Sequence, residues 1–128
     1  MNHIVESRRT VQELEAIFYD KPDGTQPAKD FLNSLDIKMQ AKMARTIQIL
    51  QDNGTALREP YSKLLEDGIF ELRAKVGSDI SRVLYFFFVG KKVILTNGFI
   101  KKSQKTPKAE IERARGYRDE FLNRKESK

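Results

Sequence analysis

The apolar positions in the first half of the chain recur mostly at helical spacing. Apolar residues three and four apart predict one helix from Thr25 to Leu35 and a longer one from Asp36 to Asn53, with Thr25 and Asp36 as expected N-caps. Gly54 follows the second helix, as glycine often does at a helix end. A short apolar run at 16–20 predicts a strand before them, and the KPDGT stretch after it predicts a turn.

The second half of the chain changes to strand patterns. Residues 69–76 alternate between apolar and charged, which predicts a half-buried strand. Residues 80–89 are almost continuously apolar, which predicts a central strand buried on both faces, and 93–100 predict a third strand. Glycine-containing turns at 77–79 and 90–92 predict that the three strands form consecutive hairpins.

Two further segments complete the expected order. Residues 55–67 lack a clear period and are interpreted as an irregular loop. Thr106 followed by Pro107 predicts the start of a terminal helix with a modest apolar stripe. The predicted fold is a single α+β domain over 1–128, in which an antiparallel sheet of about four strands carries the helices on one face. The opposite face is expected to be concave, and 1–15 and 123–128 are expected to be poorly ordered.

Composition narrows the class of protein. The chain has 128 residues, of which 39% are hydrophobic, so one core is feasible. Cysteine is absent, which excludes disulfides and thiolate metal sites, and the single histidine, His3, is a poor candidate for catalysis. No apolar run approaches the ~18 residues of a membrane span, and no secretory signal is evident. We therefore expect a cytoplasmic protein with no membrane contact and no metal or other cofactor.

The charge distribution is more informative than the net charge of +6. Residues 1–90 carry 12 Lys and Arg against 13 Asp and Glu, a sum of −1. Residues 91–128 carry 12 against 5, a sum of +7. This asymmetry is typical of a protein that binds a polyanion such as nucleic acid, although a solvated basic segment would give the same count.

Cations also interrupt the predicted sheet. Glu71, Arg73 and Lys75 share one face of their strand, and hairpin pairing is expected to bring Arg82 close to them. Like charges on neighbouring strands destabilise a sheet by a few tenths of a kcal/mol or more per pair. Such a cluster suggests an anion site, with an ordinary wet sheet face as the alternative.

The remaining residue types limit the chemistry. The sequence contains no Ser-His-Asp set, cysteine nucleophile, metal-ligand cluster or glycine-rich phosphate loop. Cations, a carboxylate and tyrosine hydroxyls suffice for cleavage of RNA, because the ribose 2′-hydroxyl is itself the nucleophile. The protein then needs only to orient the chain, remove a proton and stabilise charge on the phosphate.

Three motifs in order, DGIFELR, SRVLYFF and GFIKKSQKTP, lie within 64–107. Together they resemble the RelE/ParE superfamily of toxins, and most closely its HigB-type (phage Gp49-like) branch. The resemblance extends over roughly 16–122. It implies the toxin of a type II toxin–antitoxin pair, and in ribosome-dependent members an endoribonuclease (mRNA interferase) that cuts mRNA in the ribosomal A site.

The resemblance also implies residue roles. Arg73 falls where family members have a basic residue of the active strand, and Arg82 matches the family's phosphate-contacting arginine on the next strand. Lys101 or Lys102 matches the basic residue that ends the last strand. Glu71 is a plausible catalytic neighbour. Candidate RNA contacts outside this group are Arg58, Lys63, Lys75, Lys105 and Arg113.

Partners and alternatives follow from the same resemblance. Implied partners are mRNA, the ribosome and a HigA-like antitoxin with a helix-turn-helix domain, through which operator DNA would be bound. The histidines of other HigB proteins are absent, and Tyr117 is a doubtful match for the family's C-terminal tyrosine, so the general base is either a lysine or Glu71. A ParE-like gyrase inhibitor and a non-catalytic nucleic-acid-binding module remain alternatives.

Overall fold

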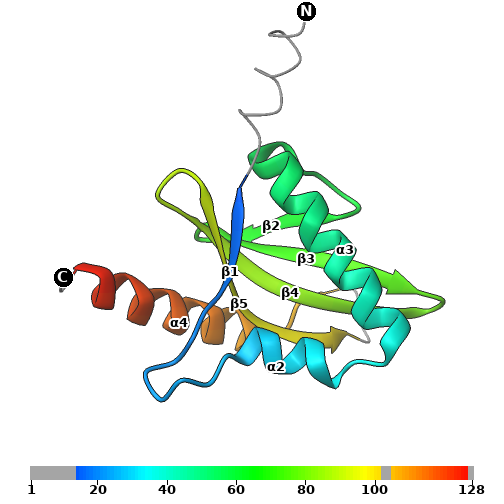
Figure 1. Cartoon of the computed structure of the whole chain (residues 1–128), viewed down its shortest axis with the longest axis horizontal. Helices are drawn as coiled ribbons and strands as arrows, with labels where there is room; N and C mark the ends of the chain where they lie inside the picture. The colour runs from blue at the N-terminus through cyan, green and yellow to red at the C-terminus, as the bar shows by residue number, and fades with distance from the viewer. Residues whose placement is uncertain (1–13, 102–104, 127–128) are drawn as a thin grey trace, which may run out of the picture.

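The computed structural model describes residues 14–101 and 105–126 and contains one five-stranded sheet (Figure 1). The strand order is β1-β5-β4-β3-β2, with β1 parallel to β5 and the other neighbours antiparallel. The strands are β1 (Glu15–Phe18), β2 (Ser62–Glu66), β3 (Ile69–Val76), β4 (Asp79–Phe88) and β5 (Lys92–Lys101). The α+β class and the central position of the apolar strand β4 are thus confirmed.

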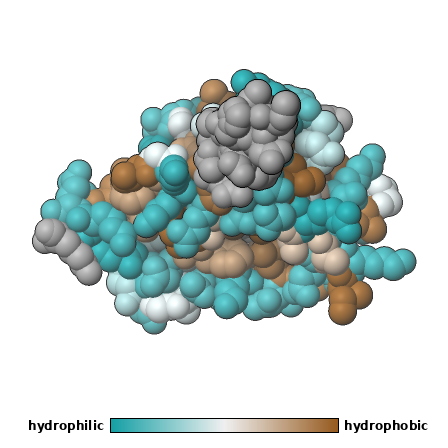
Figure 2. All heavy atoms as spheres, turned by 45° about the horizontal axis from the view of Figure 1, so that its top comes forward, coloured by the Kyte–Doolittle hydropathy of each residue, from teal (hydrophilic) through white to brown (hydrophobic). Residues whose placement is uncertain are grey.

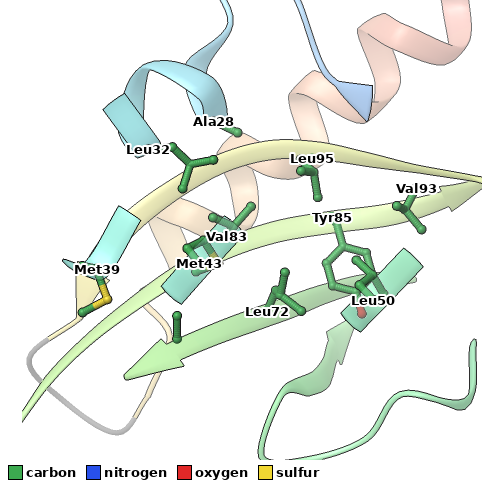
Figure 3. Packing of buried hydrophobic residues seen from close by; sticks show 11 residues of the cluster. Ala28, Leu32, Met39, Met43, Leu50, Leu72, Val83, Tyr85, Val93 and Leu95 are labelled. Atoms are coloured by element: carbon green, nitrogen blue, oxygen red, sulfur yellow. The ribbon is translucent and has the colours of Figure 1, made fainter. Parts of the chain in front are cut away.

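Two helices and one sheet face form the main core. They are α2 (Pro27–Ser34) and α3 (Ile37–Asn53), which is followed by a single 3₁₀ turn, η1 (Gly54–Ala56). Met39, Met43 and Leu50 of α3 belong to one cluster with Leu72 and Tyr85 of the sheet, and Figure 3 shows Leu50 beside Tyr85. All five side chains are buried. The apolar stripes in the sequence therefore mark the helix faces that cover the sheet.

The third long helix, α4 (Lys108–Glu126), packs against the other face of the sheet. Ile111 contacts the cluster of Ile69 and Leu84, and Phe121 meets the rings of Phe86 and Phe88 edge to face. The expectation that all helices share one face is therefore wrong. Because β4 is apolar on both sides, it needs a cover on each face, and α4 supplies the second one.

Arginines of α4 attach the helix to the rest of the fold. Arg118 and Arg115 bind the carboxylate of Asp67 at 2.7 and 3.1 Å in the β2–β3 turn, and Arg124 bonds to the Asp20 carboxylate and main-chain carbonyl. The hydrogen bonds and positive charge of Arg118 and Arg115 lower the pKa of Asp67. Much of the positive charge expected on a solvated helix thus serves to dock α4.

The helix starts agree only partly with the sequence. Asp36 caps α3 as expected, since its carboxylate accepts a hydrogen bond from the Met39 amide at 2.9 Å. Thr25 does not cap α2: the N-cap is Gln26, and the Thr25 hydroxyl donates to Asp23 at 2.7 Å. Asp23 lies two residues before Thr25 in the same tight turn, and the local hydrogen bond to it competes with capping of the helix.

The segment interpreted as an irregular loop contains the edge strand β2, so that expectation is wrong. Asp67 and Gly68 both have positive φ, 54° and 74°, and form the tight turn that joins β2 to β3. An Asp-Gly pair between two strands is a strong hairpin signal. This pair is therefore the local sequence signal for the β2–β3 hairpin.

A glycine brings α2 close to the sheet. Gly98 of β5 lies under the ring of Phe31, and a Cβ at Gly98 would come within 2.3 Å of the ring. No side chain larger than hydrogen fits there unless the Phe31 ring or the helix moves.

The surface is mainly polar. Figure 2 shows hydrophilic side chains over most of the visible face, with small separate hydrophobic areas. In the described part of the chain, no helix is both long and apolar enough to cross a membrane.

Candidate functional site

Arg73 and Arg82 lie directly opposite each other on β3 and β4. The amide of Arg73 donates to the carbonyl of Tyr61, at 2.9 Å, and so points away from β4. The two arginines therefore form a non-hydrogen-bonded pair, the type in which opposing side chains lie closest. The proximity expected from the hairpin is confirmed.

Glu71 joins the two guanidinium groups. Its Oε2 accepts hydrogen bonds from Nε of Arg73 at 2.9 Å and from a terminal nitrogen of Arg82. The Glu71 side chain is 0% exposed, whereas those of Arg82 and Arg73 are 5% and 23% exposed. The carboxylate thus offsets part of the repulsion between two adjacent cations, and only Arg73 offers much surface to an incoming molecule.

Thr106 completes the environment of Glu71. Its hydroxyl donates to Oε1 of Glu71, so both carboxylate oxygens are occupied. Burial raises the pKa of Glu71, but the hydrogen bonds from Thr106, Arg73 and Arg82 outweigh it and leave that pKa below the usual value. The sequence predicts that the terminal helix begins near Thr106; α4 begins at Lys108, and the Thr106 hydroxyl also binds a residue on the sheet.

One donor at the centre of this group lacks an acceptor. Nε of Arg82 is buried and has no hydrogen-bond partner among the residues that the structure describes. Buried donors are usually paired. The Arg73–Arg82 pair with Glu71 and Thr106, termed here the arginine cluster, therefore combines two cations, one carboxylate and spare donor capacity.

The other candidate residues occupy different places. Lys63 is opposite Glu71 in the β2–β3 register, and Lys75 follows Arg73 on β3; both are exposed. Lys105 is exposed and lies beside Thr106 before α4. Lys101 pairs with Ile80 at the end of β5, and Lys102 lies outside the described residues.

Two candidates point elsewhere. The guanidinium of Arg58 donates to the carbonyls of Thr55 and Leu57 on its own loop, at 2.7 and 3.2 Å. Arg113 pairs with Glu110 on α4 at 2.8 Å. The structure thus brings Lys63 and Lys75 to the arginine cluster and engages Arg58 and Arg113 in local contacts.

Tyr117 belongs to a packed surface. Its ring stacks on Tyr19 with centroids 4.9 Å apart.

Within the ranges 14–101 and 105–126, no group of three or more His, Asp or Glu side chains could hold a metal ion. The chemistry available near the arginine cluster is therefore that of cations, a buried carboxylate and hydroxyl groups.

Residues 30–118 match the family described as Phage derived protein Gp49-like (DUF891). The chain belongs to this family. Gp49-like proteins form a RelE/HigB-like toxin family, and the whole arginine cluster lies inside the matched range. A search of curated proteins found no significant match.

Proposed function

We propose that this Gp49-like protein is the toxin of a type II toxin–antitoxin pair and cleaves mRNA as a metal-independent endoribonuclease. The observation that carries the proposal is the in-register pair Arg73–Arg82, held by a buried glutamate at a partly open part of the sheet. Family membership supports the toxin class. The HigB-type branch, action on the ribosome in the cytoplasm, and a helix-turn-helix antitoxin are parts of the same proposal.

Arg73 is the proposed phosphate contact. Its guanidinium uses Nε to bind Glu71, which leaves the outer nitrogens for a phosphodiester. A planar guanidinium suits two phosphate oxygens at once. Arg82, being almost fully buried, would act from beneath by adding positive charge where negative charge develops during the reaction.

The proposed reaction is an in-line attack of a ribose 2′-oxygen on the adjacent phosphorus. The new P–O2′ bond replaces the P–O5′ bond, which gives a 2′,3′-cyclic phosphate and a 5′-hydroxyl. The 2′-hydroxyl loses a proton, and the leaving 5′-oxygen gains one. Lys101 or Lys102 is the proposed group at the leaving oxygen.

Glu71 is better suited to position the arginines than to act as the general base. Both of its oxygens accept hydrogen bonds, and its side chain has no exposed surface. A carboxylate with a lowered pKa is also a weaker base. We therefore assign proton removal to a lysine near the arginine cluster. Two lysines there, Lys63 and Lys75, are exposed.

The test is to map mRNA 5′ ends after induction of the wild type, Arg73→Gln and Arg73→Ala/Arg82→Ala. Arg45→Gln is the control, because Arg45 is an exposed arginine on α3 outside the cluster. We expect new ends in the wild type and in Arg45→Gln, and at least ~100-fold fewer in Arg73→Gln if it loses one transition-state contact of this kind.

Absence of new ends in the wild type would refute the nuclease. Altered DNA supercoiling in the same cells would then favour the ParE-like gyrase inhibitor, and growth without any toxicity would favour a non-catalytic binding module. New ends that persist in the double variant would show that the arginines are not the site. Circular dichroism of each variant separates lost chemistry from lost folding.

A further inference from the structure

A pocket of about 420 Å³ lies beside Arg73, toward the turn of the β3–β4 hairpin. The edge strand β2 pairs only with 69–72, so the last residues of β3 lack a strand neighbour on that side within the described chain. The pocket occupies this place. Its lining residues are Lys42, Thr46, Pro60, Tyr61, Arg73, Lys75 and Ile80.

The walls of this pocket are of two kinds. Pro60, Tyr61 and Ile80 give apolar surface, while Lys42, Arg73 and Lys75 give positive charge; the described lining contains no carboxylate. Pockets of roughly 300–1,000 Å³ are typical of small organic ligands. The ligand that fits such walls has a flat apolar part and a negative charge.

Tyr61 is the residue that defines the flat part of the ligand. The residue is 41% exposed, yet it lies in the pocket wall. The other described tyrosines all have a partner: Tyr19 and Tyr117 stack on each other, and Tyr85 bonds to Ser62. Among them, Tyr61 alone has neither a ring contact nor a hydrogen bond from its hydroxyl, so its ring face is available for stacking.

We propose that this pocket binds one base of single-stranded RNA, stacked on Tyr61, next to the phosphate held by Arg73. The inference rests on the proposed function, because Arg73 serves both places: it lines the pocket and belongs to the arginine cluster. A base and its phosphate are joined by one ribose, so a shared residue is the geometry that a nucleotide requires. Stacking on an aromatic ring accepts any base.

Lys42 and Lys75 would hold the flanking phosphate or the ribose edge. Lys42 projects from α3 and Lys75 from β3, so the two cations come from different elements of the wall. Lys38, one turn before Lys42 on α3, is exposed and does not line the pocket. This pair of lysines gives a matched comparison of equal charge on one helix.

The test uses a single-stranded RNA pentamer with 2-aminopurine at its centre and 2′-O-methyl groups throughout. The methyl groups block 2′-oxygen attack, so binding is measured whether or not the protein cleaves RNA. We expect fluorescence quenching on binding to the wild type. Tyr61→Leu should weaken binding roughly fivefold to 150-fold and lose the quenching, because one stacked base is removed. Tyr61→Trp should restore both.

Control variants show whether the loss of RNA binding is specific to the pocket. Val89→Ala removes exposed apolar surface at the other end of β4 and should leave binding unchanged. Lys42→Gln should weaken binding severalfold, and Lys38→Gln should not. Equal quenching by wild type and Tyr61→Leu, or no binding by the wild type, would overturn the inference.

Two further outcomes distinguish the proposals. Quenching that depends on Tyr61 in a protein that produces no mRNA ends would refute the nuclease and keep the base site. Cleavage of mRNA without quenching of 2-aminopurine would keep the nuclease and refute the base site. If an acidic peptide binds at Tyr61 and RNA does not, the pocket is a protein-docking site and the inference is overturned.

Discussion

Replacement of the buried carboxylate, Glu71→Gln, tests the central feature of the fold and of the site at once. The substitution keeps the shape of the side chain and removes its charge. One of the two oxygens becomes an NH₂ group, which must face either the Thr106 hydroxyl or the two guanidinium groups. The guanidinium groups can only donate, so an NH₂ group that faces them places donor against donor. If the NH₂ group faces the Thr106 hydroxyl, which can also accept, the loss is that of the negative charge.

The structure sets the expected magnitude. Arg82 has 5% of its side chain exposed and would keep its charge without a partner carboxylate. Removing one partner of a buried ion pair costs about 3–5 kcal/mol. Because small domains are stable by about 5–15 kcal/mol in total, this is a large share of the free energy of unfolding.

The measurement is urea unfolding at pH 7, followed by circular dichroism. Glu66→Gln is the matched control, since Glu66 also binds an arginine, Arg115, at 2.7 Å, but its side chain is 51% exposed. An exposed pair is worth about 0–1 kcal/mol. If Glu71→Gln costs no more than Glu66→Gln, the reasoning about the buried pair is wrong.

The pH dependence gives a second test of the same residue. The pKa of Glu71 is lowered in the folded state, so its ionised form stabilises the protein at pH values above its unfolded pKa of ~4.3. This contribution is lost as the pH falls through the lower, folded-state pKa. The stability difference between wild type and Glu71→Gln should therefore be constant from about pH 7 to 5 and shrink below about pH 4.

Substitutions at three further positions test local contacts, all by thermal or urea unfolding. Gly98→Ala should destabilise by about 1–3 kcal/mol, since the added methyl meets the Phe31 ring, and an unchanged midpoint would contradict that contact. Asp36→Ala should cost ~1 kcal/mol through the lost α3 cap, whereas Asp36→Asn should cost little. Tyr85→Phe should cost about 1–3 kcal/mol because it leaves the buried Ser62 hydroxyl without its 2.6 Å partner; a neutral result would show that this pair adds nothing.

Local patterns predicted most elements and the Arg73–Arg82 contact. The helical stripes and the Asp36 cap need only residues within a turn or two, and hairpin pairing needs only a short connection. The edge strand β2 was missed because its residues, SKLLE, lack a clear alternation. The Asp67-Gly68 turn was the available signal.

The state of Glu71 could not be predicted from alternation. Its strand position gives a polar face, which is normally wet. It is buried because Thr106 returns to it from 35 positions further along the chain and because α4 covers the same sheet face. Such contacts depend on the path of the whole chain. The pocket at Tyr61 is equally non-local, since it exists only where β2 stops short beside α3.

The docking of α4 also bears on how this basic protein would respond to salt. Binding to single-stranded nucleic acid weakens with ionic strength by a slope of ~0.7 per phosphate neutralised, because each contact releases condensed counterions. Arg115, Arg118 and Arg124 already face carboxylates of their own chain. They should add little to that slope, so the excess positive charge of the last third overstates the number of ions that a bound RNA would displace.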